Sequence, residues 1–153
     1  MKVKEIMTTE PKTCTPDTSV ADAAHLMWDG DCGILPVVDD GSLVGVVTDR
    51  DMYIALATQN ARASQLRVGA VATTKVARCE PEDDVRTALA AMKEARVRRL
   101  PVVGFNGTVL GMLSMNDILR VAGKGKGLAN DDIVETLQAI CAHHHPAPHV
   151  VAA

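Results

Sequence analysis

Aromatic side chains are almost missing from this sequence: Trp28, Tyr53 and Phe105 are the whole set, 2% of 153 residues. So few rings exclude the rows of stacking side chains with which proteins hold single-stranded nucleic acid. The formal net charge is only −3, so the charge of the chain does not indicate nucleic acid as a partner either. Hydrophobic residues make up 47% of the chain. With so few rings this core must be aliphatic, which favours β-branched strands packed on alanine- and leucine-rich helices.

Long apolar runs and paired cysteines are also missing. The opening residues MKVKEIM lack the apolar stretch of a signal peptide, and no segment approaches the roughly 20 apolar residues of a membrane helix. The four cysteines, Cys14, Cys32, Cys79 and Cys141, form no C-x-x-C pair. We therefore expect a cytoplasmic protein without a membrane segment, whose cysteines are reduced thiols that serve mainly as small buried side chains.

An internal repeat organises the chain. Residues 3–38 align with residues 68–103 at an offset of 65, and both copies hold a proline, a cysteine and the run LPVV at matched positions. One extra residue in the second copy then raises the offset to 66. Chance does not readily match these residue types at one spacing, so we interpret the chain as two copies of one unit.

Each copy predicts the element order β-α-β-β-α. An opening strand is expected in residues 10–16 and again in 74–81. Asp17 in the first copy and a run of acidic residues in the second mark a helix start, where the helix dipole favours negative charge. Turn signals at Asp39-Asp40-Gly41 and Asn106-Gly107 predict hairpins. The expected buried helix positions are Val20, Ala23, Ala24, Met27, Val85, Ala88, Leu89 and Met92.

These patterns predict an α/β (α+β) fold with two pseudo-symmetric units packed through their sheets, plus a C-terminal helix. The units span residues 1–57 and 68–122, and the polar residues 58–67 link them. Residues 123–153 hold a glycine-rich break, an amphipathic helix that starts with a capping signal at Asn130, and a tail.

The tail gathers histidines close to a cysteine. Such ligands suit zinc, copper or nickel. Three adjacent histidines cannot share one helix face, however, so we expect a frayed, titratable tail and no metal site, with metal binding as the alternative. The residues concerned are Cys141, His143, His144, His145 and His149. His25 lies opposite the apolar stripe of its helix and is expected to be exposed.

The end of each unit sets a hydroxyl and a carboxylate three residues apart at a helix start. Thr48 and Asp51 form this pair in the first copy, and Ser114 and Asp117 form it in the second. A carboxylate can accept hydrogen bonds from both hydroxyls of a ribose, and a hydroxyl with free backbone N–H groups suits phosphate. Alternatively, the two aspartates only cap their helices. The two roles are compatible.

In order, these motifs resemble a tandem cystathionine-β-synthase (CBS) domain pair, often called a Bateman module. The resemblance covers about four-fifths of the chain, from Val3 to Ala122. It rests on IMT near the start (weakened to VAT in the second copy), LPVV, and G-h-h-[T/S]-x-x-D, where h is hydrophobic. It implies two clefts that hold adenosine ligands: AMP first, with ADP, ATP, NAD or S-adenosylmethionine as alternatives. It also implies a disc-like homodimer.

The resemblance assigns a role to several positions. Asp51 and Asp117 match the ribose-binding position, and Thr48 and Ser114 match the phosphate-binding hydroxyl. Arg98 and Arg99, just before LPVV, match a basic position that reaches phosphate, unless they form a solvated run with Arg96. The remaining candidates line the base or add a phosphate contact: Thr9, Glu10, Pro11, Ile34, Val46, Thr74, Lys75, Val76, Met112 and Asn116.

The first copy has Gly33 and Ile34 where the second has Arg98 and Arg99. Arg50 is therefore the expected phosphate ligand near Asp51, and we predict tighter mononucleotide binding near Asp117. The sequence holds no nucleophile–base pair and no phosphate-binding loop of the Walker type, so we expect a non-enzymatic sensor of an adenine nucleotide that acts on a separate partner protein. The alternative is a ligand-independent dimerisation scaffold. The C-terminal helix is a candidate docking element.

Overall fold

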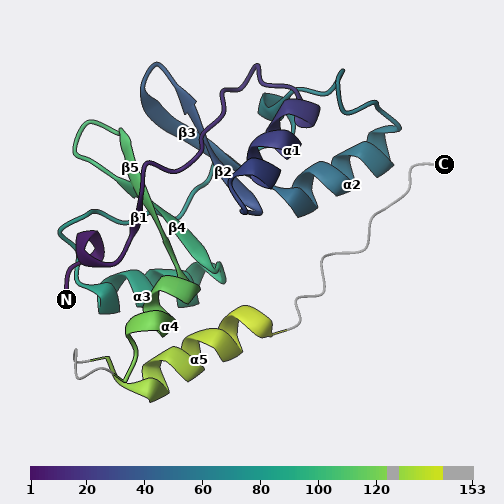
Figure 1. Ribbon diagram of the computed structural model, residues 1–153. Helices are drawn as coiled ribbons and strands as arrows, with labels where there is room; N and C mark the ends of the chain where they lie inside the picture. Colours follow the sequence, from purple (N-terminus) through teal and green to yellow (C-terminus); the bar gives the residue numbers. More distant parts are fainter. Residues whose placement is uncertain (124–127, 143–153) are drawn as a thin grey trace.

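The computed structural model describes residues 1–123 and 128–142. Two halves of similar build lie side by side, each a hairpin with helices packed against it (Figure 1). The elements are η1 (Val3–Glu5), β1 (Thr8–Thr9), α1 (Val20–Asp29), β2 (Ile34–Asp39), β3 (Ser42–Thr48), α2 (Asp49–Gln59), η2 (Val68–Ala70), α3 (Val85–Ala95), β4 (Arg99–Val103), β5 (Val109–Ser114), α4 (Met115–Val121) and α5 (Asn130–Cys141), where η is a 3-10 turn.

The first helix of each half begins at a side-chain cap. Asp84 accepts a hydrogen bond from the backbone N–H of Arg86 at 2.9 Å, as its acidic run predicted. In the first half the cap is Ser19, which accepts from Asp22 N–H at 3.0 Å, and Asp17 lies before this cap. The predicted buried stripe is confirmed in both helices except at Ala24, which is exposed.

The two hairpins follow from their turn residues. β2 pairs antiparallel with β3, and Asp40 and Gly41 between them both have positive φ, as a turn matched to the twist of the strands requires. β4 pairs with β5 in the same way. The predicted opening strands at 10–16 and 74–81 are wrong, because each segment makes only a single parallel bridge, at Cys14 and at Cys79.

The two halves exchange their first segments. Val3 lies in the core of the second half, where its N–H donates to the carbonyl of Asp83 at 3.0 Å. Val68 lies in the core of the first half and donates to the carbonyl of Thr18 at 2.9 Å. Each structural half therefore combines residues from both sequence repeats, and the expected limits of the repeats at 57 and 68 stay predictions.

The exchange explains the glycine of the repeated motif. Thr8 and Thr9 of β1 pair with Met112 and Gly111 of β5, and Thr73 bridges Val46 of β3. A Cβ atom on Gly111 would lie 2.7 Å from the carbonyl oxygen of Thr8, which is closer than real contacts allow. A Cβ on Gly45 would lie 3.0 Å from the carbonyl oxygen of Thr73. Both glycines thus permit a close crossing of two backbones.

Helix α5 covers the second half. Its Ile133 is buried, and Leu137 and Ile140 pack against the same core, while Lys93 of α3 forms an ion pair with Glu135 at 2.8 Å. The expected C-terminal helix is confirmed, although its cap is Ala129 without a side-chain hydrogen bond and not Asn130. Ile133, Leu137 and Ile140 of the helix pack within the chain, while Val134 is exposed, and a docking role for this helix stays a prediction. Residues 124–127 of the predicted break at 123–127, and the tail histidines, lie outside the described residues.

Candidate functional site

The hydroxyl–carboxylate pairs form reciprocal caps at the starts of α2 and α4. Ser114 Oγ accepts from the N–H of Asp117 at 3.2 Å. In return, Asp117 Oδ2 accepts from the N–H of Ser114 at 2.9 Å and from its hydroxyl at 2.6 Å. Thr48 and Asp51 repeat the arrangement: Thr48 Oγ1 accepts from Asp51 N–H at 3.1 Å, and Asp51 Oδ2 accepts from the N–H and the hydroxyl of Thr48 at 3.1 and 2.7 Å. Both aspartates do cap their helices, and in each the cap uses only Oδ2, so Oδ1 lies outside the cap.

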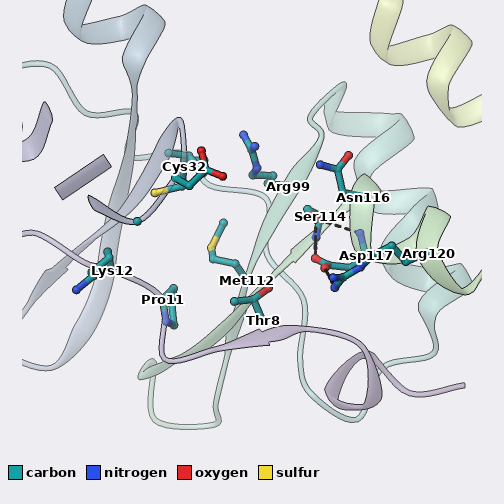
Figure 2. Close-up of a pocket in the computed structure, with 13 residues that line it drawn as sticks. Thr8, Pro11, Lys12, Cys32, Arg99, Met112, Ser114, Asn116, Asp117 and Arg120 are labelled. Atoms are coloured by element: carbon teal, nitrogen blue, oxygen red, sulfur yellow. Dashed lines mark hydrogen bonds and ion pairs between the residues drawn. The ribbon is translucent and has the colours of Figure 1, made fainter. Parts of the chain in front are cut away.

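A cavity of about 480 Å³ lies beside the second of these caps, a volume suited to a small ligand. Figure 2 shows its walls: Ser114 and Asp117 lie on one side, Cys32 lies on the other, and Met112 lies between the two sides. The lining residues are Thr8, Pro11, Lys12, Gly30, Asp31, Cys32, Ile34, Arg99, Met112, Ser114, Asn116, Asp117 and Arg120. Both halves of the molecule contribute to it.

Many of the residues proposed from the sequence meet in this cavity. They are Pro11, Ile34, Arg99, Met112, Ser114, Asn116 and Asp117. Arg98 does not line it: its side chain is exposed, while its backbone carbonyl accepts from Met115 N–H at 2.9 Å. Arg99 is the first residue of β4 and pairs with Ser114, which brings it to the cavity.

Two segments, residues 8–14 and 73–79, cross from one half to the other before the first helix of each repeat; we call them the entry segments. Residues 8–14 run from β5 of the second half, at Met112, to β2 of the first half, at Val37. Residues 73–79 run the opposite way, from β3 to β4. Pro11 therefore lies in the cavity of Asp117, although the sequence grouped it with the first unit. The other base-lining candidates do not line this cavity. Thr9 and Glu10 belong to the first entry segment, and Thr74, Lys75 and Val76 belong to the segment that bridges β3 at Val46, itself a candidate.

Sequence reasoning missed several lining residues. Arg120 was detectable, because residues three apart on a helix are neighbours and Asp117 was already a candidate. Lys12 directly follows Pro11 in an entry segment already considered. Thr8 belongs to the exchanged first segment, whereas Gly30, Asp31 and Cys32 lie between α1 and β2 of the first half, and no local signal places any of the four beside Asp117.

Charges of both signs face this cavity. Lys12, Arg99 and Arg120 supply positive charge, and Asp31 and Asp117 supply negative charge. Asp117 is only 6% exposed, and its Oδ1 accepts from Arg120 Nη2 at 2.8 Å. The cationic side chains outnumber the carboxylates by one, so the cavity suits a ligand that combines hydroxyl groups with a modest negative charge.

The first half differs around its own cap. Asp51 and Thr48 are half-buried, and the Arg50 side chain is exposed. A cavity of about 380 Å³ between α1 and α2 is lined by Asp49 and Trp28 rather than by Asp51. The two aspartates of the repeat therefore share their capping geometry but differ in the surroundings that the structure gives them.

Within residues 1–123 and 128–142, no three His, Cys, Asp or Glu side chains are grouped so that they could hold a metal ion. His25 is exposed, as expected. None of the helices described is both long and apolar enough to span a membrane. Cys14 and Cys79 are buried as predicted, whereas Cys32 is half-buried and Cys141 is exposed.

The two halves exchange their first segments, and a ligand-sized cavity lies beside the aspartate that caps α4. These features define a tandem-repeat binding module. The model of the CBS domain family matches residues 3–58 and 68–124. The chain therefore belongs to the CBS domain family and is a tandem CBS pair. The CBS domain-containing protein YhcV of Bacillus subtilis is 34% identical over 116 residues, which cover 76% of this chain and 81% of YhcV.

Solved structures agree with this fold and include ligand complexes. The CBS domain pair of protein MJ0100, in complex with 5′-methylthioadenosine and S-adenosyl-L-methionine, has a TM-score of 0.73 and 28% identity, over 82% of this chain and 98% of that one. CBSX2 of Arabidopsis thaliana, in complex with AMP, has a TM-score of 0.68 and 29% identity, over 80% and 96%. Relatives of this chain thus bind adenosine-containing small molecules.

Proposed function

We propose that this chain is a non-catalytic regulatory module that binds an adenine nucleotide, with AMP as the preferred ligand, and acts on a separate partner protein. The observation that carries the proposal is the buried carboxylate of Asp117 in the wall of a cavity that also presents cationic side chains. AMP in CBSX2 and the adenosine compounds in MJ0100 support the same class of ligand.

Each part of AMP has a matching group in the cavity. The ribose hydroxyls would donate to Asp117 Oδ1, which is the oxygen not used by the helix cap. Arg99 and Lys12 would pair with the phosphate, and the amide of Asn116 would add a hydrogen bond. Met112 and Pro11 would cover the faces of the base.

The charge of the cavity selects among the adenosine ligands. S-adenosylmethionine carries a sulfonium cation, which gains nothing from the surplus of positive side chains. ATP carries more negative charge than these side chains neutralise, because Asp31 and Asp117 face the same space. Among these three ligands, AMP matches the balance of charges best. The cleft near Asp51, with Thr48 and Arg50, is proposed to bind more weakly or a different ligand.

Calorimetric titration of nucleotide-stripped protein with AMP, ATP, NAD and S-adenosylmethionine tests this function. Asp117→Asn keeps the size of the side chain and removes the charge, and Asp51→Asn is the matched control in the other cap. Losing a charged hydrogen-bond partner costs about 1.5–3 kcal/mol, so Asp117→Asn should weaken AMP binding by roughly one to two decades. Unchanged affinity in that variant would contradict the assignment, and no binding by any of the four would favour the scaffold alternative.

Regulation also requires a partner and, by the family resemblance, a second copy of the module. The helical face of the first half supports such an interface, because Trp28 is 85% exposed and Tyr53 is 74% exposed there. Large exposed rings are favoured at interfaces. Light scattering of wild type and of Trp28→Glu would test homodimer formation; a dimer unaffected by the glutamate would place the interface elsewhere.

A further inference from the structure

The carboxylate of Asp117 has one oxygen left for a ligand, and Arg120 already holds it. Oδ2 is used twice by Ser114, through its N–H and its hydroxyl. Oδ1 accepts from Arg120 Nη2 at 2.8 Å. Figure 2 shows the guanidinium against the carboxylate at one end of the cavity, and Arg120 itself is a lining residue. A ribose diol that approaches Asp117 must therefore share Oδ1 with this cation or displace it.

The other copy of the repeat shows that the cap does not need this ion pair. Asp51 forms the same reciprocal cap with Thr48. At the offset of 66 residues, the position of Arg120 is taken by Ile54, which has no charge. The arginine is thus present only at the second of the two caps, and it forms an ion pair with Asp117, which lines the cavity.

The ion pair is also easy to exchange. The side chain of Arg120 is 73% exposed, whereas that of Asp117 is 7% exposed. An exposed, flexible guanidinium held by a single short contact is stabilised little by it, because water competes for the cation. Rotation about its side-chain bonds can move the guanidinium away from Oδ1 while it stays at the rim of the cavity.

We propose that Arg120 makes the Asp117 cavity select nucleotides over nucleosides, an inference that rests on the proposed function. A ribose diol displaces Arg120 from Asp117. A phosphate on the same ligand then supplies a new anionic partner for the freed guanidinium, in the planar geometry that arginine favours. A nucleoside displaces the same cation and offers no anion in return. Phosphate recognition and ribose recognition are thereby coupled through one side chain.

Titrations with AMP and with adenosine test the coupling, in wild type, Arg120→Gln and Arg120→Lys. Wild type should prefer AMP. Arg120→Gln should lower AMP affinity by about tenfold to a hundredfold, the scale of one charged hydrogen bond. The same variant should bind adenosine as tightly as wild type or more tightly, since the competitor for Oδ1 is gone. Arg120→Lys should keep part of the preference. Arg62→Gln, an exposed arginine in the segment between the repeats, is the control and should change neither affinity.

The outcomes separate this inference from the function on which it rests. If AMP binds to wild type and Asp117→Asn weakens it, but Arg120→Gln changes AMP and adenosine affinity by equal factors, the role of Arg120 is overturned and the nucleotide site stands. If Arg120→Gln weakens both ligands and Arg120→Lys restores neither, the arginine only supports the fold around the cap. If neither ligand binds to wild type, the proposed function fails and this inference fails with it.

Discussion

Replacing the glycine of the second repeat motif tests the crossing on which the cavity depends. In Gly111→Ala, the new methyl group would lie 2.7 Å from the carbonyl oxygen of Thr8 and 2.8 Å from Met7 Sδ. The backbone oxygen belongs to β1, which pairs directly with β5 at this point, so it cannot move without breaking that pairing. The N-terminal segment must shift away from the second half.

The magnitude follows from two opposing effects. Forcing a methyl group into a packed site costs about 1–3 kcal/mol, whereas replacing glycine by alanine reduces the entropy of the unfolded chain and returns about 0.4–1 kcal/mol. The net loss of unfolding free energy is therefore about 1–2 kcal/mol. For a chain of this length it corresponds to a melting temperature lower by roughly 2–8 °C. Because Thr8 lines the cavity, AMP affinity should fall as well.

Two further glycines give a graded series for the same assay, thermal or urea unfolding followed by circular dichroism. Gly45→Ala meets the carbonyl oxygen of Thr73 at 3.0 Å and should cost less than Gly111→Ala. Gly104→Ala meets the end of the flexible Leu110 side chain at 3.1 Å and Asn106 Oδ1 at an ordinary 3.5 Å, and should be close to neutral. If Gly111→Ala is as stable as Gly104→Ala, the close crossing of β1 over β5 is not how the chain packs.

Two other predictions concern the core. Burial raises the pKa of Cys14 to about 11 and that of Cys79 to about 12, from 9.0. Above pH 9 the unfolded chain releases thiol protons that the folded chain keeps, so the free energy of unfolding should fall by about 1 kcal/mol per thiol between pH 9 and 10. Urea titrations of the double variant Cys14→Ala/Cys79→Ala should lack this dependence of the unfolding free energy on pH. An equal pH dependence in wild type and variant would contradict the prediction. Ile133→Ala should destabilise the protein by about 2–4 kcal/mol through the cavity that it leaves under α5. Val134 is 51% exposed, so Val134→Ala should change the unfolding free energy by less than about 0.5 kcal/mol. Equal costs for the two variants would refute the packing of α5 on the second half.

The repeat predicted the elements of each half well because its signals are local. Helical spacing around Val85 and Met92, the Asp40-Gly41 turn and the Ser114–Asp117 cap each depend on residues within one or two turns of chain. The structure confirms them, and the sheet-forming runs around LPVV lie in β2 and β4. Signals of this range survive tertiary packing because the packing uses the same apolar faces.

The exchange of segments was not predictable from the same signals. Residues 10–16 read as a strand of the first unit, yet they cross between the halves and bridge only at Cys14. Gly111 carried the relevant information, since a glycine inside a strand marks a close backbone approach, but nothing local identifies Thr8 as the partner. Asp31 and Cys32 were missed for a related reason: they follow α1 in the first half, and nothing local shows that this segment lines the cavity beside Asp117.

The exchange also gives the proposed sensor a physical route for its output. A ligand in the Asp117 cavity would touch Met112 of β5, Thr8 of β1 and Ile34 of β2, so both halves would contact the same molecule. A ligand shifts a conformational equilibrium only if it binds one arrangement better than another. Here any relative movement of the halves changes the spacing between Ile34 and Met112, and with it the fit of the ligand. Affinity and the relative placement of the halves are therefore coupled, and a partner that contacts both halves would respond to the nucleotide without touching it.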